Sequence, residues 1–263
     1  MEEETSRPIS RERRIPLKGA VNFRDLGGYE TLDGRRTKWG QIFRSDSLAR
    51  LTATDQTVLK GMNIRLVYDF RTPGEVKHSP DRLPEDGVIE YLHLPVVHGE
   101  FDSVKALERI KKGDISWLSK DFMVNGYIRN VEEFGETWGN VLHRMIEPES
   151  RPLVFHCTGG KDRAGVCAAL FLLSLGVPED TVVYDHGLSN VYIGELLGRI
   201  YEWIREIGID PEAVAPYFTA PRECIIACLD HIREVYGSVA DYLRTKAGID
   251  DEKLGLLKDQ LLE

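Results

Sequence analysis

The segment from Leu153 to Leu175 constrains the fold of this chain more than any other. It begins with a short apolar run that ends at His156, passes through a turn with two adjacent glycines, and continues as a long apolar stretch. The short run predicts a buried strand and the long stretch predicts a buried helix. A buried strand that leads directly into a helix is typical of α/β domains.

Short elements before this segment fit the same pattern. Strands are predicted at 41–45, 64–70 and 88–94. Asp33-Gly34 is predicted to be a hairpin turn. Thr52, followed by Asp55, predicts the start of a helix that ends near Gly61.

Helices dominate the rest of the chain. Apolar residues recur at steps of three and four from Met123 to Met145, which predicts one long helix. Residues 95–116 carry no strong pattern, and a mobile loop over a site is expected there. After the central segment, helices are predicted over 178–190, 191–207, 222–236, 238–247 and 250–261. Strands that alternate with helices, followed by a helical C-terminal third, predict a single α/β domain.

The length and the composition agree with one domain. The chain has 263 residues, of which 42% are hydrophobic, so it can bury a sizeable core. The charged residues 1–16 are expected to be disordered or loosely packed, and residues 17–263 to form the domain.

Charge, cysteine content and hydropathy argue against several classes of protein. The chain has 34 basic and 43 acidic residues, a formal charge of −9, which argues against a nucleic-acid-binding protein. Four cysteines in a chain of this length predict reduced thiols rather than a disulfide framework. No apolar run resembles a signal peptide or a membrane span, so we expect a cytoplasmic protein without integral membrane association.

The turn that follows His156 groups residues suited to phosphate chemistry. It runs from Cys157 to Arg163, with Gly159 and Gly160 between them. A strand-to-helix turn directs backbone N–H groups and the positive end of the helix dipole at one point, and glycines let the backbone close around an anion. A cysteine in such a field is stabilised as the nucleophilic thiolate, and an arginine offers two parallel donors to phosphate. The turn therefore predicts a nucleophile, an anion site and a clamping cation within seven residues.

A structural explanation competes with this prediction. Free cysteine is among the most buried residue types, so a cysteine at a strand end is more often a core thiol. For Cys157 or Arg163 alone that explanation is the better one. Their combination between a strand and a helix favours the functional prediction.

The His-Cys pair at 156–157, with an arginine six positions after the cysteine, resembles the signature of the protein tyrosine phosphatase superfamily. Further blocks are similar to the atypical bacterial and fungal tyrosine/lipid phosphatases, whose loop carries Lys-Asp before its arginine. These blocks are Asn22-Phe-Arg-Asp-Leu-Gly-Gly28, Phe43-Arg-Ser45, Asp69-Phe-Arg-Thr-Pro-Gly-Glu75 and, in the loop, Lys161-Asp162. The resemblance covers nearly the whole chain. It implies a tyrosine-phosphatase-like fold with a central, mostly parallel sheet flanked by helices, and no metal or organic cofactor.

The resemblance also implies roles for the loop. Cys157 would attack phosphorus and form a phosphocysteine, and Arg163 would bind the phosphate and offset its charge. His156 is expected to be a hydrogen-bonding support rather than a base. The phosphate-binding residues would be Thr158, Gly159, Gly160, Lys161, Asp162 and Arg163.

The leaving oxygen needs a proton donor, and several aspartates are candidates. The resemblance implies the loop aspartate, Asp162, and a carboxyl group beside a phosphate dianion favours its protonated form. Many superfamily members instead use an aspartate on a separate loop, for which Asp102 and Asp114 are alternatives. Asp69 and water are further alternatives.

Two loop positions bear on turnover and substrate. The superfamily usually has Ser or Thr after its arginine, a hydroxyl that assists departure of the sulfur, but here the residue is Ala164. Slower breakdown of the phosphoenzyme is therefore expected. Lys161 matches the lysine of superfamily lipid phosphatases that act on multiply phosphorylated inositols, and the alternative is a solvated lysine without a role in selectivity.

Some neighbouring charged residues are interpreted as structural. Asp69, Arg71 and Glu75 are expected to form a local ion-pair network. Arg24 and Asp25 are expected to brace the site or the fold.

Two further clusters have competing interpretations. Cys224, Cys228 and His231 share one side of a predicted helix, and a buried stripe is favoured over a zinc site because no fourth ligand is evident. Tyr217 and Phe218 are either an aromatic lid or ordinary core.

Three functions follow from these observations. The first is a cysteine-dependent protein-tyrosine phosphatase, with dual specificity left open. The second is a phosphoinositide or inositol phosphate phosphatase with the same mechanism. The third is a pseudophosphatase that binds phosphorylated ligands without turnover, which Ala164 keeps open.

Overall fold

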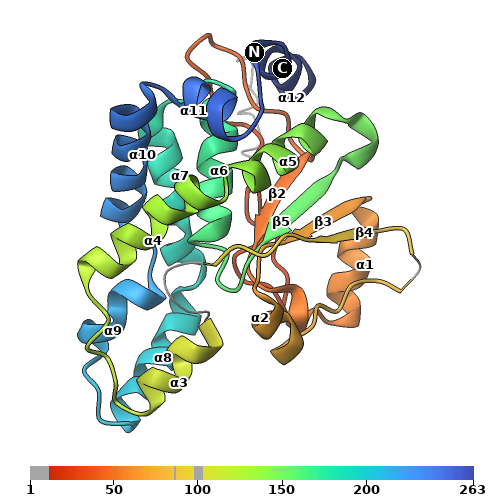
Figure 1. The fold of residues 1–263 in the computed structure, drawn as a ribbon. Coiled ribbons are helices and arrows are strands. Elements are labelled where there is room, and N and C mark those ends of the chain that lie inside the picture. The colour runs from red at the N-terminus through yellow and green to blue at the C-terminus, as the bar shows by residue number, and fades with distance from the viewer. Residues whose placement is uncertain (1–11, 86, 98–102) are drawn as a thin grey trace, which may run out of the picture.

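A computed structural model describes residues 12–85, 87–97 and 103–263 (Figure 1). Within these residues the chain forms a five-stranded sheet in the order β1-β2-β5-β3-β4. The strands in that order are β1 (Arg24–Asp25), β2 (Ile42–Ser45), β5 (Leu153–His156), β3 (Leu66–Asp69) and β4 (Glu90–His93). β1 is antiparallel to β2, and all other neighbours are parallel. The predicted α/β class and the mostly parallel sheet are confirmed.

The register of the parallel strands brings three chain segments to one edge of the sheet. Ser45 of β2 and Asp69 of β3 both pair with His156 of β5, which lies between them. The chain leaves the sheet directly after each of these residues. In α/β sheets this carboxyl edge is where ligands bind. The segments that follow the three strands therefore all begin at this carboxyl edge; they are residues 46–47, 70–75 and 157–163.

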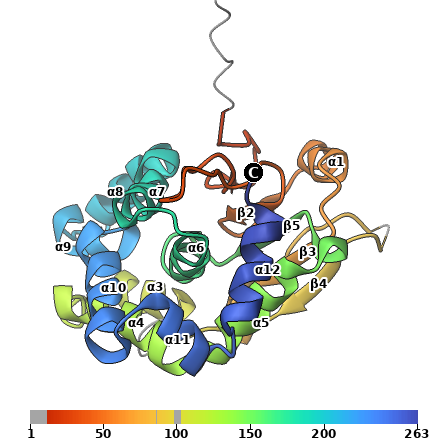
Figure 2. The same cartoon turned by 90° about the horizontal axis from the view of Figure 1, so that it is seen from above.

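Alternate strand residues pack against helices on opposite faces of the sheet. One face packs against α1 (Ala53–Gly61) through Phe43, Val67 and Val154. The other face belongs to a larger core with α5 (Gly135–Ile146) and α6 (Arg163–Ser174), and contributes Leu66, Tyr68, Leu153 and Phe155. Figure 2 shows α1 on one side of the strands and α5 with α12 (Asp251–Leu261) on the other.

Several predicted elements agree closely with the structure. The strand after Pro152 and the helix that ends near Leu175 correspond to β5 and α6. The hairpin turn forms, with the Gly34 N–H donating to the Thr31 carbonyl at 3.0 Å. A capping box between Thr52 and Asp55 starts α1, because each side chain accepts a hydrogen bond from the other residue's backbone.

The C-terminal third is helical, as predicted. Its helices are α7 (Glu179–Tyr192), α8 (Gly194–Glu206), α9 (Pro211–Phe218), α10 (Arg222–Tyr236), α11 (Val239–Lys246) and α12. After α12 the chain returns to the hairpin, where Glu263 and Arg36 exchange two backbone hydrogen bonds of 2.8 Å. None of the helices in the described part of the chain is long and apolar enough to cross a membrane.

The packed part of the chain begins before residue 17. The Arg13 guanidinium donates to the Asp25 carbonyl at 2.9 Å and lies 3.7 Å from the ring centroid of Tyr29. Residues 12–16 thus belong to the folded unit, whereas 1–11 lie outside the described residues.

The single long helix predicted from Met123 to Met145 is wrong. The chain forms α4 (Lys120–Glu133) and α5, separated at Phe134, whose φ of −118° leaves the helical range. The start of α5 packs closely against the end of α11: a Cβ on Gly135 would lie 2.7 Å from the Lys246 carbonyl oxygen, and one on Gly139 would lie 1.9 Å from the Ala247 carbonyl oxygen. The apolar period continues across the break because both helices face the same core.

Three short helices were not predicted: α2 (Pro73–His78), α3 (Ser103–Lys111) and α9. Residues 103–111 fall in the segment for which a loop was expected, and they form α3 instead. Figure 1 shows α3, α8 and α9 grouped at one end of the molecule. Their shared core contains Ile110, Ile204 and Val214. A short helix such as α3 depends on these distant partners. The start of α2 does carry a local signal, because Thr72 and Glu75 form a capping box with Pro73 between them.

Candidate active site

The turn after β5 is a tight loop that leads into α6. Cys157 follows the last strand residue and is 1% exposed, and Arg163 is the first residue of α6. Gly160 has a φ of +67°, and a Cβ there would lie 2.5 Å from backbone atoms of Ser45 and Asp46. Only glycine therefore fits where the loop passes the end of β2.

The carbonyl oxygens of four successive loop residues accept hydrogen bonds from outside the loop. The donors are Ser47 N–H to Thr158 (3.1 Å), Asn22 Nδ2 to Gly159 (3.0 Å), and Arg44 Nη2 to Gly160 (2.8 Å) and Lys161 (3.3 Å). The N–H and C=O of a planar trans peptide point in opposite directions. The N–H groups of residues 159–162 are therefore turned inward and can surround an anion.

A buried ion-pair network fixes the outer donors. Asp185 of α7 accepts hydrogen bonds from Arg24 Nε (3.1 Å), Arg44 Nη1 (2.6 Å) and the Tyr29 hydroxyl (2.7 Å). Burial alone would raise the pKa of Asp185, but the charges of Arg24 and Arg44 outweigh it and lower the pKa below its ordinary value. Arg24 also donates to the side chain of Asn22. The N-terminal block that carries Arg24 thus braces the loop, as expected.

Arg163 is held at the loop by a buried carboxylate. Its guanidinium makes two parallel hydrogen bonds with Glu75, at 2.7 Å and 2.8 Å. The hydroxyls of Thr158 and Ser103 also donate to Glu75, each at 2.5 Å. A guanidinium fixed along one edge by a carboxylate keeps a defined orientation for its other donors.

Glu75 therefore differs from the sequence-based expectation. It was expected to join Asp69 and Arg71 in one ion-pair network, but it lies on the short α2 and pairs with Arg163 instead. Burial would raise the pKa of Glu75, whereas the hydrogen bonds and charge of Arg163 lower it below the ordinary value. Burial likewise opposes the charge of Arg163, but Glu75 raises the pKa of Arg163 above its ordinary value.

The expected local network forms around Asp69 and Arg71. Arg71 lies 2.7 Å from Asp69 and 2.8 Å from Asp81, and His156 lies 3.0 Å from Asp81. Burial would lower the pKa of His156, but Asp81 raises it above the ordinary value. Burial would raise the pKa of Asp69, but the charges of His156 and Arg71 lower it to about 2. Asp69 is thus held as a paired carboxylate beside His156, which does not suit a proton donor.

The same cluster contains the ligand atoms for a possible metal site. One atom each from Asp69, Asp81 and His156 lies within 4.8 Å of the others. The guanidinium of Arg71, however, already bridges both carboxylates and supplies the positive charge. The cluster therefore does not fit a metal ion.

Asp162 lies at the junction of the loop and two helices. Its Oδ2 is 2.7 Å from the Lys161 ammonium, and its Oδ1 accepts a hydrogen bond of 2.7 Å from the Tyr127 hydroxyl. Tyr127 Oη is also 2.9 Å from Nε2 of His186. Of the predicted acids, Asp162 is the one that belongs to the loop itself.

The other candidate acids occupy different surroundings. Asp114 is half exposed and accepts a hydrogen bond from Arg109 at 2.6 Å and one from Ser116 at 3.2 Å, after the C-terminal end of α3. Asp102 lies outside the described residues.

Aromatic side chains lie beside Lys161. The Lys161 ammonium is 5.9 Å from the ring centroid of Tyr217, and Lys161 is only 7% exposed. Tyr217 packs edge-on against Trp117 and Phe218, with centroid distances of 5.7 Å and 5.2 Å. Tyr217 therefore belongs to the core of α3, α8 and α9, as one of the two interpretations expected, and it also borders the loop.

The cysteine stripe on α10 is structural, as interpreted. Cys224 and Cys228 are buried in the main core, and His231 contacts Glu132 of α4 at 2.7 Å.

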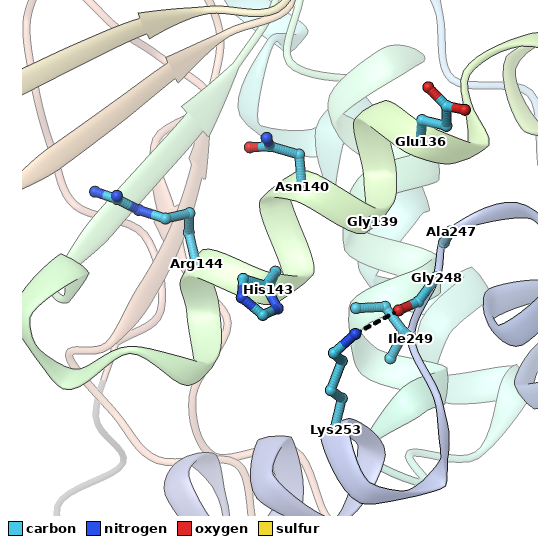
Figure 3. Close-up of a pocket in the computed structure, with 9 residues that line it drawn as sticks. All are labelled: Glu136, Gly139, Asn140, His143, Arg144, Ala247, Gly248, Ile249 and Lys253. Atoms are coloured by element: carbon cyan, nitrogen blue, oxygen red, sulfur yellow. Dashed lines mark hydrogen bonds between the residues drawn. The ribbon is translucent and has the colours of Figure 1, made fainter.

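A surface pocket of about 350 Å³ lies between α5 and the segment that joins α11 to α12 (Figure 3). Figure 3 shows Lys253 directed at the Gly248 carbonyl, to which its ammonium donates at 2.8 Å. None of the residues that line this pocket belongs to the 157–163 loop. The candidate site is therefore defined by the loop and its donors rather than by this pocket.

Sequence reasoning missed the partners that hold the loop. Asp185 and His186 are buried neighbours on α7, and Tyr127 is buried on α4. On a predicted helix, such residues resemble ordinary polar and aromatic positions. The one available signal of a functional role was the pair of adjacent polar residues, Asp185 and His186, on a predicted helix.

Comparison with known proteins identifies the family. A model of the tyrosine phosphatase family matches residues 15–263. The chain is 30% identical over 277 aligned residues to the triple specificity protein phosphatase PtpB of Mycobacterium tuberculosis, covering 94% of this chain and 98% of that protein. It is 28% identical over 233 residues to a protein of Cupriavidus necator assigned to the tyrosine-protein phosphatases, covering 89% of this chain and 84% of that protein. With a family model that spans nearly its whole length, the chain belongs to the tyrosine phosphatase family.

Proposed function

We propose that this phosphatase hydrolyses phosphotyrosine in proteins through a phosphocysteine at Cys157. The observation that carries the proposal is the convergence of Cys157, the inward N–H groups of residues 159–162 and the guanidinium of Arg163. Preorganised donors of this kind stabilise the charge that develops on a phosphoryl group in the transition state.

The proposed reaction has two displacements. In the first, the Cys157 sulfur bonds to phosphorus, the bond to the leaving oxygen breaks, and the Asp162 carboxyl group gives its proton to that oxygen. In the second, water attacks phosphorus and gives a proton to Asp162, and the S–P bond breaks to restore the thiolate. Arg163 and the loop amides hold the phosphoryl oxygens throughout.

The burial of Cys157 supports an aromatic substrate. Because Cys157 is 1% exposed, a phosphoryl group must reach below the surface to contact the sulfur. A phosphotyrosine side chain is longer than phosphoserine and suits this depth. The related PtpB is described as a triple specificity phosphatase, so we propose that phosphoserine and phosphothreonine are slower substrates of the same site.

Phosphoinositides are the second candidate, and Lys161 is the observation that favours them. Its ammonium lies beside the loop but is paired with Asp162 at 2.7 Å, so an inositol phosphate would have to compete for it. Assays of phosphopeptides and phosphoinositides without added metal separate the two candidates. A pseudophosphatase, which the missing hydroxyl at Ala164 left open, predicts binding without turnover in the same assays.

Replacing Asp162 with asparagine tests the assigned acid. An aryl phosphate with a good leaving group needs little protonation, whereas a phosphoserine peptide needs a proton on its leaving oxygen. We therefore expect Asp162→Asn to lower kcat/KM for the phosphoserine peptide by about 10²–10⁴-fold, and for the aryl phosphate by much less. Steady-state kinetics on both substrates measure the difference.

Asp114→Asn is the matched control, because Asp114 is a half-exposed aspartate outside the loop. It should leave both substrates nearly unchanged. An equal loss on both substrates in Asp162→Asn would indicate a distorted loop rather than a lost acid. No loss on either would exclude Asp162 as the proton donor.

A further inference from the structure

We propose that Tyr127 and His186 position the carboxyl group of Asp162 so that its Oδ2 atom carries the transferred proton. The proposal rests on the proposed function, in which Asp162 is the acid. It assigns a role to two buried residues outside the loop and names the atom that reacts.

The contacts form a chain from the loop into the helical half of the molecule. The hydroxyl of Tyr127 on α4 lies 2.7 Å from Oδ1 of Asp162 and 2.9 Å from Nε2 of His186 on α7. Tyr127 is fully buried and His186 is 1% exposed, and their rings meet edge-on with centroids 5.7 Å apart. A tyrosine held on both sides in this way cannot rotate its hydroxyl freely.

The number of available protons fixes which group donates in each hydrogen bond among Asp162, Tyr127 and His186. A tyrosine hydroxyl has one hydrogen, and a neutral imidazole has one N–H. If Tyr127 donates to Asp162 Oδ1, then His186 must donate from Nε2 to the Tyr127 oxygen. In the reverse direction, the Asp162 proton would sit on Oδ1, Tyr127 would donate to Nε2, and the imidazole hydrogen would have to sit on Nδ1.

The surroundings of His186 favour the first direction. Nδ1 of His186 is buried and has no hydrogen-bond partner in the part of the chain that the structure describes. An N–H at that atom would be buried without an acceptor, which costs free energy. Burial, and then the charge of Arg44, lower the pKa of His186 to about 3, so the ring is neutral and carries one N–H. That hydrogen therefore belongs on Nε2.

It follows that Oδ1 of Asp162 accepts the hydrogen of the Tyr127 hydroxyl and that the transferred proton is carried by Oδ2. In the described structure Oδ2 faces the Lys161 ammonium at 2.7 Å. A phosphate dianion in the loop attracts the same ammonium and repels the carboxylate, which favours a proton on Oδ2. During the first displacement this proton passes to the leaving oxygen as its bond to phosphorus breaks, and the attacking water returns one in the second.

Three variants test the role of Tyr127 and His186. Tyr127→Phe keeps the ring and removes the hydroxyl. We expect it to lower kcat/KM for a phosphoserine peptide about 10-fold or more, because part of the rate enhancement from acid catalysis by Asp162 is lost. For an aryl phosphate with a good leaving group, kcat/KM should fall only slightly. His186→Leu should act in the same way. His186→Gln places an amide N–H near the position of Nε2, and it should restore the preference between the two substrates toward that of the natural protein.

A double-mutant cycle separates this proposal from the proposed function. If Tyr127 acts through Asp162, adding Tyr127→Phe to Asp162→Asn should cause little further loss on the phosphoserine peptide. An equal loss on both substrates in Tyr127→Phe, or a full additional loss in the double variant, would show a purely structural tyrosine and overturn the proposal. If Asp162→Asn itself does not discriminate between the substrates, the assigned acid is wrong and this proposal falls with it.

Discussion

Cys157→Ser is expected to abolish turnover, with kcat lowered at least about 10⁴-fold on every phosphomonoester. A serine hydroxyl is not ionised at neutral pH, so the nucleophile is lost. The loop amides and Arg163 are unchanged in Cys157→Ser, so binding of inorganic phosphate should persist. Steady-state assays with an aryl phosphate and calorimetric titration with phosphate measure the two effects separately.

Cys167→Ser is the matched control for this experiment. Cys167 is a second buried free thiol, on α6, and burial raises its pKa well above the ordinary value, so it stays protonated. Its substitution should leave kcat close to that of the natural protein. Turnover that survives Cys157→Ser would contradict the proposed mechanism, as would activity that a chelator removes and a metal ion restores.

The second large effect is expected at Arg163. Lysine keeps the positive charge but cannot bond Glu75 along one edge and phosphate along the other, because its ammonium is a single point of charge. An arginine that stabilises a phosphoryl transition state contributes about 10³–10⁵-fold. We expect Arg163→Lys to lower kcat/KM by roughly 10³-fold or more. The loss should be similar for good and poor leaving groups, unlike that of Asp162→Asn.

Arg129→Lys provides the control. Arg129 is partly exposed on α4 and pairs with Glu133 four residues later, so the substitution should have little effect. Thermal unfolding of both variants checks that the fold is intact. A folded Arg163→Lys protein with activity within about 10-fold of the natural protein would show that the bidentate clamp is not needed.

The parts of the fold that depend on neighbouring residues could be predicted from the sequence. β5, the glycine turn and α6 are consecutive, so one apolar pattern and the turn chemistry describe all three. The sequence around Phe134 does not mark the break between α4 and α5, and the close approach of Gly139 to Ala247, more than a hundred residues away, leaves no local signal. The apolar residues on both sides of Phe134 keep a helical period, which hides the break.

The candidate site divides in the same way. Cys157 and Arg163 lie within one turn, so spacing and turn chemistry alone make them candidates, whereas Asp162 became the candidate acid through the family resemblance. Glu75 reaches Arg163 across 88 residues, and Asp185 reaches Arg44 across 141. The register of β2, β5 and β3 creates the first of these contacts, since it places the three strand ends together. No local pattern contains that information.

Rapid-quench mass spectrometry tests the central claim, a phosphocysteine at Cys157, most directly. The natural protein is mixed with an aryl phosphate that has a good leaving group, denatured within milliseconds, digested and analysed. We predict one phosphoryl group on the peptide that contains Cys157, and none in Cys157→Ser. The absence of a hydroxyl at Ala164 should help this species to accumulate. A burst of the released phenol with no phosphate on Cys157, or a phosphoryl group on another residue, would contradict the proposed mechanism.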